Sequence, residues 1–325
     1  MAAGNETQVH VYEQVATLIS CGLSVLGSLL IILTYALWAD LRTTPRRLLA
    51  FLSIADLLSA GSYFYGACRM FDRESWDCVA QGAISTFSNT SSFFWTVAIA
   101  LYLYVFIVRA NQRAADGLVQ YFHLVSWGVP LSITLAALLL RKIGYDASEV
   151  SVGWCWVSIR ARDHVAWMLL TGKVWEILAY FTLPVLYILI KRHIQRAHAT
   201  LSEYRPILAN NTTSNSLSSM ADLKLTLIPI IFIFLRMWST IRFILMLVRS
   251  PARQSPVLVT LHGIGNTFQG AANCIMFVLF TQPIRTRLAA FFCCRNQPPT
   301  SQQRGDTNTP SYSNGTVPQG WDSDN

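Results

Sequence analysis

Charged side chains are scarce in this sequence. Asp, Glu, Lys and Arg together make up 13% of the 325 residues, whereas ordinary soluble domains carry roughly 25%. Apolar residues make up 53%, and a chain of this composition does not stay soluble alone. The composition therefore excludes an ordinary soluble domain and favours a membrane protein.

Clustered metal ligands and catalytic groups are also missing. The seven cysteines stand at irregular intervals, with one adjacent pair, Cys293 and Cys294, and the six histidines are dispersed along the chain. A zinc site needs regularly spaced Cys and His residues, and a membrane hydrolase needs clustered ligands or a nucleophile beside its base. We therefore expect no metal, no cofactor and no enzymatic activity.

Basic residues outnumber acidic ones, with 25 Lys and Arg against 17 Asp and Glu. An excess of positive charge can indicate nucleic-acid binding, but these basic residues gather in short loops between apolar runs. That placement is typical of loops that face the anionic inner leaflet of a membrane. We expect contact with membrane lipid and no nucleic-acid partner.

Long apolar runs dominate the first 280 residues, and each is long enough to cross a bilayer as a helix. They predict an all-α membrane protein, a bundle of seven transmembrane helices within residues 15–280. The expected spans are about Val15–Leu37, Leu48–Cys68, Cys78–Val108, Tyr121–Leu140, Val165–Ile190, Leu223–Val248 and Pro256–Phe280.

The orientation follows from the distribution of positive charge. Segment 1–14 contains no Lys or Arg, whereas Arg46 and Arg47 follow the first run. Because positive loops stay in the cytosol, we expect the amino terminus outside a plasma-membrane protein and the carboxyl terminus inside. An extracellular start would expose Asn5, which begins an N-glycosylation sequon.

The third run begins at a cysteine and carries several polar residues, so we expect its helix to lie among other helices. If Cys78 is extracellular, Cys155 is the candidate partner for a disulfide, because it lies in the long loop 141–164. The alternative is two free cysteines. The polar residues of this run are Gln81, Ser85, Asn89, Ser91 and Ser92.

Three polar residues on different spans fall at a similar depth when residues are counted from the loops at about 1.5 Å each. They are Asp56, Asn89 and Gln269. One interpretation is a polar switch that holds water or a cation and rearranges on activation. The other is a static hydrogen-bond network between helices.

Four further charges lie within the fifth and sixth spans. Glu176 and Arg236 match in depth, so we expect an ion pair between them. Lys173 and Arg242 lie nearer the outside, and they predict a positive outer cavity for an anionic or polar ligand. The alternative is that Lys173 extends to the membrane surface and Arg242 pairs with a loop acid. We expect His262, within the seventh span, to be an interhelical hydrogen-bond donor.

The segment after the last span has an amphipathic pattern. Residues 281–294 place apolar side chains on one face and Arg285 on another, which predicts a short eighth helix on the inner leaflet. We expect Cys293 and Cys294, at its end, to be palmitoylation sites. The tail 295–325 is rich in polar residues and Pro, so we expect it to be disordered.

Several motifs in these spans resemble those of G-protein-coupled receptors. Trp127–Pro130, Phe268–Gly270 and Gln282–Arg285 are similar to segments of the secretin, adhesion and cyclic-AMP receptor groups, and Leu52–Leu58 is similar to the rhodopsin group. Leu103–Phe106 departs from the acidic-Arg-aromatic triplet of the rhodopsin group, and the seventh span lacks Asn-Pro-x-x-Tyr. No hormone-binding ectodomain precedes the first span, which argues against the secretin and adhesion groups.

The resemblance implies a receptor for an extracellular ligand that the sequence does not identify. Ligand binding would open the cytosolic face and drive nucleotide exchange on a heterotrimeric G protein. Hydroxyl residues in segment 212–219 and the tail would be targets for receptor kinases and arrestin, or simply a solvated linker. The basic residues expected to meet the G protein are Arg46, Arg47, Arg109, Arg192 and Arg285.

Two other membrane proteins share features with this prediction. A retinal pump needs a Schiff-base lysine, and the seventh span contains none. A transporter of a small polar or anionic solute remains as the alternative, although transporters often show repeated halves and we find no internal repeat.

Overall fold

The computed structural model describes residues 9–146, 148–203, 230–280 and 282–292. Among these residues, six helices are long and apolar enough to cross a membrane. They are α1 (Val11–Leu37), α2 (Thr44–Arg69), α3 (Trp76–Val108), α4 (Gln112–Leu139), the continuous stretch His164–Ala197, and the helix Ile230–Leu247.

The stretch His164–Ala197 is built from three pieces. It contains α5 (His164–Met168), a π-helical turn (Leu169–Lys173) and the first part of α6 (Val174–Glu203). The smaller elements of the chain are the 3₁₀ turns Ala39–Leu41 and Pro251–Gln254, the strands β1 (Ile143–Gly144) and β2 (Trp156–Val157), and the helices α8 (Pro256–Thr267), α9 (Gln269–Phe280) and α10 (Gln282–Phe292).

Side-chain caps extend some helices beyond their apolar runs. Asn111 accepts a hydrogen bond from the backbone N–H of Ala114 at 2.9 Å, as an N-cap residue should. Helix α4 therefore begins at Gln112, nine residues before the predicted start at Tyr121. The predicted span from Tyr121 describes the apolar membrane core, and the helix has further turns before it, because hydropathy does not detect helical turns outside the core.

The predicted seventh span is divided into α8 and α9, which meet at Phe268. The break leaves a backbone donor of α9 without its intrahelical acceptor, and the N–H of Ala271 instead donates to Ser24 Oγ of α1 at 3.1 Å. Backbone groups inside a membrane need such partners. Each of the two helices has 12 residues, which is too short to cross a bilayer alone.

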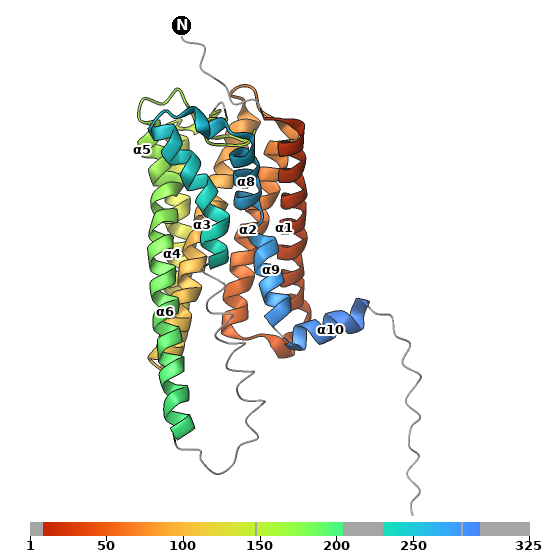
Figure 1. Cartoon of the computed structure of the whole chain (residues 1–325), viewed down its shortest axis with the longest axis vertical. Coiled ribbons are helices and arrows are strands. Elements are labelled where there is room, and N and C mark those ends of the chain that lie inside the picture. Colours follow the sequence, from red (N-terminus) through yellow and green to blue (C-terminus); the bar gives the residue numbers. More distant parts are fainter. Residues whose placement is uncertain (1–8, 147, 204–229, 281, 293–325) are drawn as a thin grey trace, which may run out of the picture. The chain divides into compact units, whose positions relative to one another are not determined.

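Helix α3 packs against α2, α4 and α6, whereas α1 packs against α2, α8 and α9 (Figure 1). The polar residues of α3 had predicted this position among other helices. On one side, its Trp95 and Tyr102 lie in an apolar core with Leu52 of α2. On another side, Phe93 packs with Leu183 of α6.

The two strands form an antiparallel pair next to α3. A disulfide joins Cys78 of α3 to Cys155 beside β2, with the Cα atoms 5.5 Å apart. This is the pairing expected from the sequence, and we call this end of the bundle the disulfide end. Most of α10, from Pro283 onward, belongs to a separate unit.

Candidate functional site

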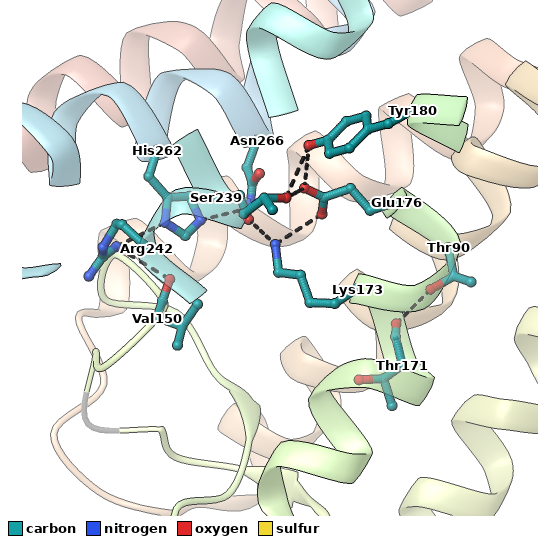
Figure 2. Close-up of polar contacts among 11 residues, drawn as sticks. Thr90, Val150, Thr171, Lys173, Glu176, Tyr180, Ser239, Arg242, His262 and Asn266 are labelled. Atoms are coloured by element: carbon teal, nitrogen blue, oxygen red, sulfur yellow. Dashed lines mark hydrogen bonds and ion pairs between the residues drawn. The ribbon is translucent and has the colours of Figure 1, made fainter. Parts of the chain in front are cut away.

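A buried ion pair joins Lys173 and Glu176 inside the bundle (Figure 2). The Lys173 Nζ donates to Glu176 Oε2 at 3.0 Å, and each side chain is only 3% exposed. The predicted pairing of Glu176 with Arg236 is wrong, and so is the alternative in which Lys173 extends to the membrane surface. The π-helical turn that ends at Lys173 alters the helical register, so that Lys173 faces inward above Glu176.

Hydrogen bonds extend this pair to the helix Ile230–Leu247. Lys173 Nζ donates to Ser239 Oγ at 2.5 Å. Glu176 Oε1 accepts from the hydroxyl of Tyr180 at 2.7 Å and from the hydroxyl of Thr240. Each charged group therefore has several partners, as buried charges require. We call these five residues, Lys173, Glu176, Tyr180, Ser239 and Thr240, the Lys173 network. The network connects α6 to the middle of the helix Ile230–Leu247.

Arg242 holds the loop before β2 rather than facing an open cavity. Its guanidinium donates to the carbonyls of Ser151 at 2.9 Å and Val150 at 3.3 Å, and its Nε donates to the carbonyl of Arg253 at 3.1 Å. The expectation of a salt bridge to a loop acid was wrong in detail, since backbone oxygens are the hydrogen-bond acceptors. Buried loop carbonyls need partners, and Arg242 supplies them.

The neighbours of His262 fix its tautomer. Arg242 Nη1 lies 2.9 Å from His262 Nδ1, and a guanidinium can only donate, so Nδ1 is the acceptor. The proton must then be on Nε2, which lies 2.9 Å from the side-chain amide of Asn266. The structure places Asn266 Nδ2 beside the ring. A 180° rotation of the amide brings its oxygen there, and this oxygen can accept the Nε2 proton that the tautomer requires. His262 donates to another part of the same helix and accepts from a neighbouring one.

Arg236 is the least satisfied charge of the site. It is 1% exposed, and its Nε and Nη1 have no hydrogen-bond partner among the described residues. The guanidinium carbon lies 4.8 Å from the centre of the Phe93 ring, which provides a cation–π contact. The side chain adds positive charge between the Lys173 network and Asp56.

The three residues expected to form a polar switch are only partly connected. Asp56 accepts hydrogen bonds from Ser92 at 2.6 Å and Asn273 at 2.7 Å. Gln269 reaches Asp56 indirectly, because its amide donates to Asn273 at 3.2 Å. Asn89 lies elsewhere, on the wall of the cavity near Lys173. Equal depth did not bring Asn89 to Asp56, since Ser92 occupies the facing position on α3.

Two cavities lie on either side of the Lys173 network. The cavity toward the disulfide end has a volume of about 30 Å³, and its walls include Asn89, Lys173, Glu176 and His262. The second has a volume of about 230 Å³ and is lined mainly by apolar side chains. Its walls include Leu49, Leu103, Tyr187, Phe232, Gln269 and Met276.

Comparisons with known proteins decide the class of this bundle. A family model described as 7 transmembrane receptor (Secretin family) matches residues 11–272. The chain is 63% identical to the G-protein coupled receptor 157 of Rattus norvegicus over 301 residues, which cover 92% of this chain and 91% of the rat protein. The chain belongs to the G-protein-coupled receptors.

Other relatives agree with this assignment. The receptor is 63% identical to the Homo sapiens G-protein coupled receptor 157 over 312 residues, or 94% of this chain and 92% of the human one. It is 27% identical to the Cyclic AMP receptor-like protein A of Dictyostelium discoideum over 204 residues, or 62% of this chain and 51% of that one. The transporter alternative is therefore not favoured. The match to the secretin family agrees with the resemblance of Trp127–Pro130 to that group.

The basic residues expected to contact a G protein lie mostly at the end of the receptor opposite the disulfide. Arg109 and Arg192 are exposed there. Arg46 is half-buried, and Arg47 is exposed with its guanidinium 5.8 Å from the Phe51 ring. The remaining predicted positions fall elsewhere: Arg285 is exposed in the separate unit, and Asn5, Cys293, Cys294 and segment 212–219 lie outside the described residues.

Proposed function

We propose that the receptor transmits ligand binding at its disulfide end to a heterotrimeric G protein at the opposite end. The observation that carries this proposal is the hydrogen-bond network between the two cavities. It joins Lys173 of the π-helical turn to Ser239, and Glu176 and Tyr180 of α6 to Thr240, on the helix Ile230–Leu247. A change in this network alters the relative position of two long helices. It therefore also alters the shape of the two cavities on either side of the network.

The proposed orientation has the disulfide end outside the cell, in the plasma membrane. Helices α8 and α9 together form the seventh crossing, since their 24 residues in succession span about 36 Å at 1.5 Å per residue. The tail after the bundle then starts in the cytosol, and α10 lies along the inner leaflet. This orientation places Asn5 where it can be glycosylated, and Cys293 and Cys294 where they can be palmitoylated.

The proposed boundaries are an outer segment 1–14, the bundle 15–280, the amphipathic helix 281–294 and the cytosolic tail 295–325. The basic residues opposite the disulfide would then face the G protein. Receptor kinases and arrestin would act on hydroxyl groups in segment 212–219 and in the tail.

In the proposed ligand site, Lys173 and Glu176 respond to the occupant of the outer cavity, and Arg236 lies beneath them. Arg242 shapes the site indirectly by holding the loop. Asp56 and Gln269, joined through Asn273, form the switch that adjoins the inner cavity. Asn89 belongs to the outer cavity in this scheme, because it lines that wall.

The proposal is tested by expressing the receptor with a panel of G-protein α subunits and measuring their activation. Epitope tags at the two ends report the orientation in intact cells. The expected result is activation of at least one α subunit, with the amino-terminal tag accessible outside and the carboxyl-terminal tag inside. Both tags on one face of the membrane would contradict the proposed orientation.

A further inference from the structure

The loop before β2 enters the bundle instead of crossing its surface. In segment Ser148–Trp154, Val150, Ser151 and Val152 are each 1% exposed and Trp154 is 4% exposed. Loops normally stay at the surface because their backbone polar groups need partners. A buried loop of this length requires a site that is shaped to receive it.

The surrounding helices have such a site. A Cβ atom on Gly66 of α2 would lie 2.6 Å from the Cβ of Trp154, so only glycine leaves room there. The Trp154 ring packs 4.6 Å from the Tyr63 ring and 5.8 Å from the His262 ring, measured between ring centres. Gly153 has a φ of +82°, a conformation that favours glycine. The segment therefore has one defined shape in the bundle.

The backbone of the segment is held by polar side chains from the bundle. Arg242 binds the carbonyls of Ser151, Val150 and Ser148. Just after the segment, the N–H of Cys155 donates to Gln81 Oε1 of α3 at 2.8 Å. A binding site recognises a peptide by contacts of this kind, in which charged and amide side chains form hydrogen bonds with the backbone of the peptide.

Little space is left beside the segment. The outer cavity, with Val150 and Trp154 among its walls, has a volume of about 30 Å³, which is room for only about two water molecules. A small-molecule ligand with a volume of a few hundred Å³ does not fit while the segment is in place. The site that the proposed function assigns to a ligand is already filled by the chain itself.

We infer that segment Ser148–Trp154 is the receptor's own peptide agonist, permanently tethered in the ligand site. This inference rests on the proposed function, because it names the ligand of the same site. An agonist is any occupant that binds the active conformation better than the inactive one. A tethered agonist produces G-protein activation without an added ligand.

The geometry of the helix Ile230–Leu247 indicates activation rather than inhibition. Its middle is held by hydrogen bonds from Ser239 to Lys173 and from Thr240 to Tyr180 of α6. Arg242 binds the segment nearer the outer end. A rigid helix that is held at its middle moves its two ends in opposite directions. Movement of the outer end toward the segment therefore moves the inner end away from the centre of the bundle. Phe232, at the inner end, lines the 230 Å³ cavity.

The test compares Trp154→Ala with Trp76→Ala, a matched control because Trp76 lies at the same end of the bundle but is 83% exposed. Ligand-free G-protein activation is measured at equal surface expression. We expect Trp154→Ala to lower it at least about fivefold, because the main apolar contact of the agonist is removed. The control should match wild type. If Trp154→Ala does not reach the surface, Val150→Ala replaces it, with an expected loss of about twofold.

A synthetic peptide of residues 148–154 provides the second arm. Added to the Trp154→Ala receptor at about millimolar concentration, which is what a short tether supplies, it should restore activity. The same peptide with Ala at the Trp154 position should not. Unchanged or raised ligand-free activity in Trp154→Ala, or no rescue by the native peptide, overturns the inference.

Co-purification with a nucleotide-free G protein separates this inference from the proposed function. A wild-type receptor that forms this complex but has no ligand-free activity overturns the tethered agonist and leaves the proposed function standing. A receptor that binds no G protein at all overturns both.

Discussion

The buried pair of Lys173 and Glu176 leads to a quantitative prediction. Both side chains are 3% exposed, and the charged atoms are 3.0 Å apart. In Glu176→Gln the ammonium group stays buried without its counter-ion, which costs about 3–5 kcal/mol. A direct Coulomb estimate is of similar size, since two charges 3.0 Å apart attract by about 5.5 kcal/mol at an effective dielectric constant of about 20.

The assay is thermal unfolding of the purified receptor in lipid nanodiscs. A loss of about 3–5 kcal/mol of stability in Glu176→Gln should lower the melting temperature by on the order of 10 °C. Lys173→Met should have a similar effect, because it leaves the carboxylate without its counter-ion. The double variant Lys173→Met/Glu176→Gln removes both charges, so its loss should be smaller than the sum of the single losses by about 2 kcal/mol or more.

The exposed pair Lys142–Asp163 is the matched control for this cycle. Its side chains are 22% and 50% exposed, and an exposed pair contributes only about 0–1 kcal/mol. If Glu176→Gln is no more destabilising than Asp163→Asn, or if the two changes in the buried pair are additive, the reasoning about the Lys173–Glu176 pair is wrong.

Three further predictions concern the disulfide end and are measured by the same unfolding assay. Cys155→Ser should cost about 2–5 kcal/mol, whereas Cys68→Ser, at an exposed free cysteine, should change little. Burial raises the pKa of Asp146 from 3.8 to about 6. Its contribution to stability is therefore greatest below about pH 4 and falls as the pH rises through 6. Asp146→Asn should abolish this dependence of stability on pH. Gly153→Ala should cost roughly 1–3 kcal/mol, because its φ of +82° strains a residue that carries a Cβ atom.

Hydropathy alone predicted most of the helices, because a segment in lipid must satisfy its own backbone groups and few structures do so. It missed the helical turns before Tyr121, which depend on the Asn111 cap. It also missed the division of the last apolar run at Phe268. That break depends on a side chain from another helix, Ser24, which a pattern within one segment does not reveal.

The site was predictable only as a set of buried charges. The charged residues counted as deep along their helices are buried inside the bundle, but depth does not specify the face of the helix. The π-helical turn before Lys173 changed that face, and Glu176 gained a different partner. Asn273 and Ser92, which bind Asp56, are ordinary polar residues in the sequence. Only the tertiary structure distinguishes them from Asn89.

The most direct test of the account is nucleotide exchange on purified heterotrimeric G proteins by the receptor in nanodiscs, with no ligand added. The wild-type receptor should accelerate exchange on at least one α subunit over empty nanodiscs, and Trp154→Ala should lose most of this acceleration. Exchange at the rate of empty nanodiscs for every α subunit would contradict it.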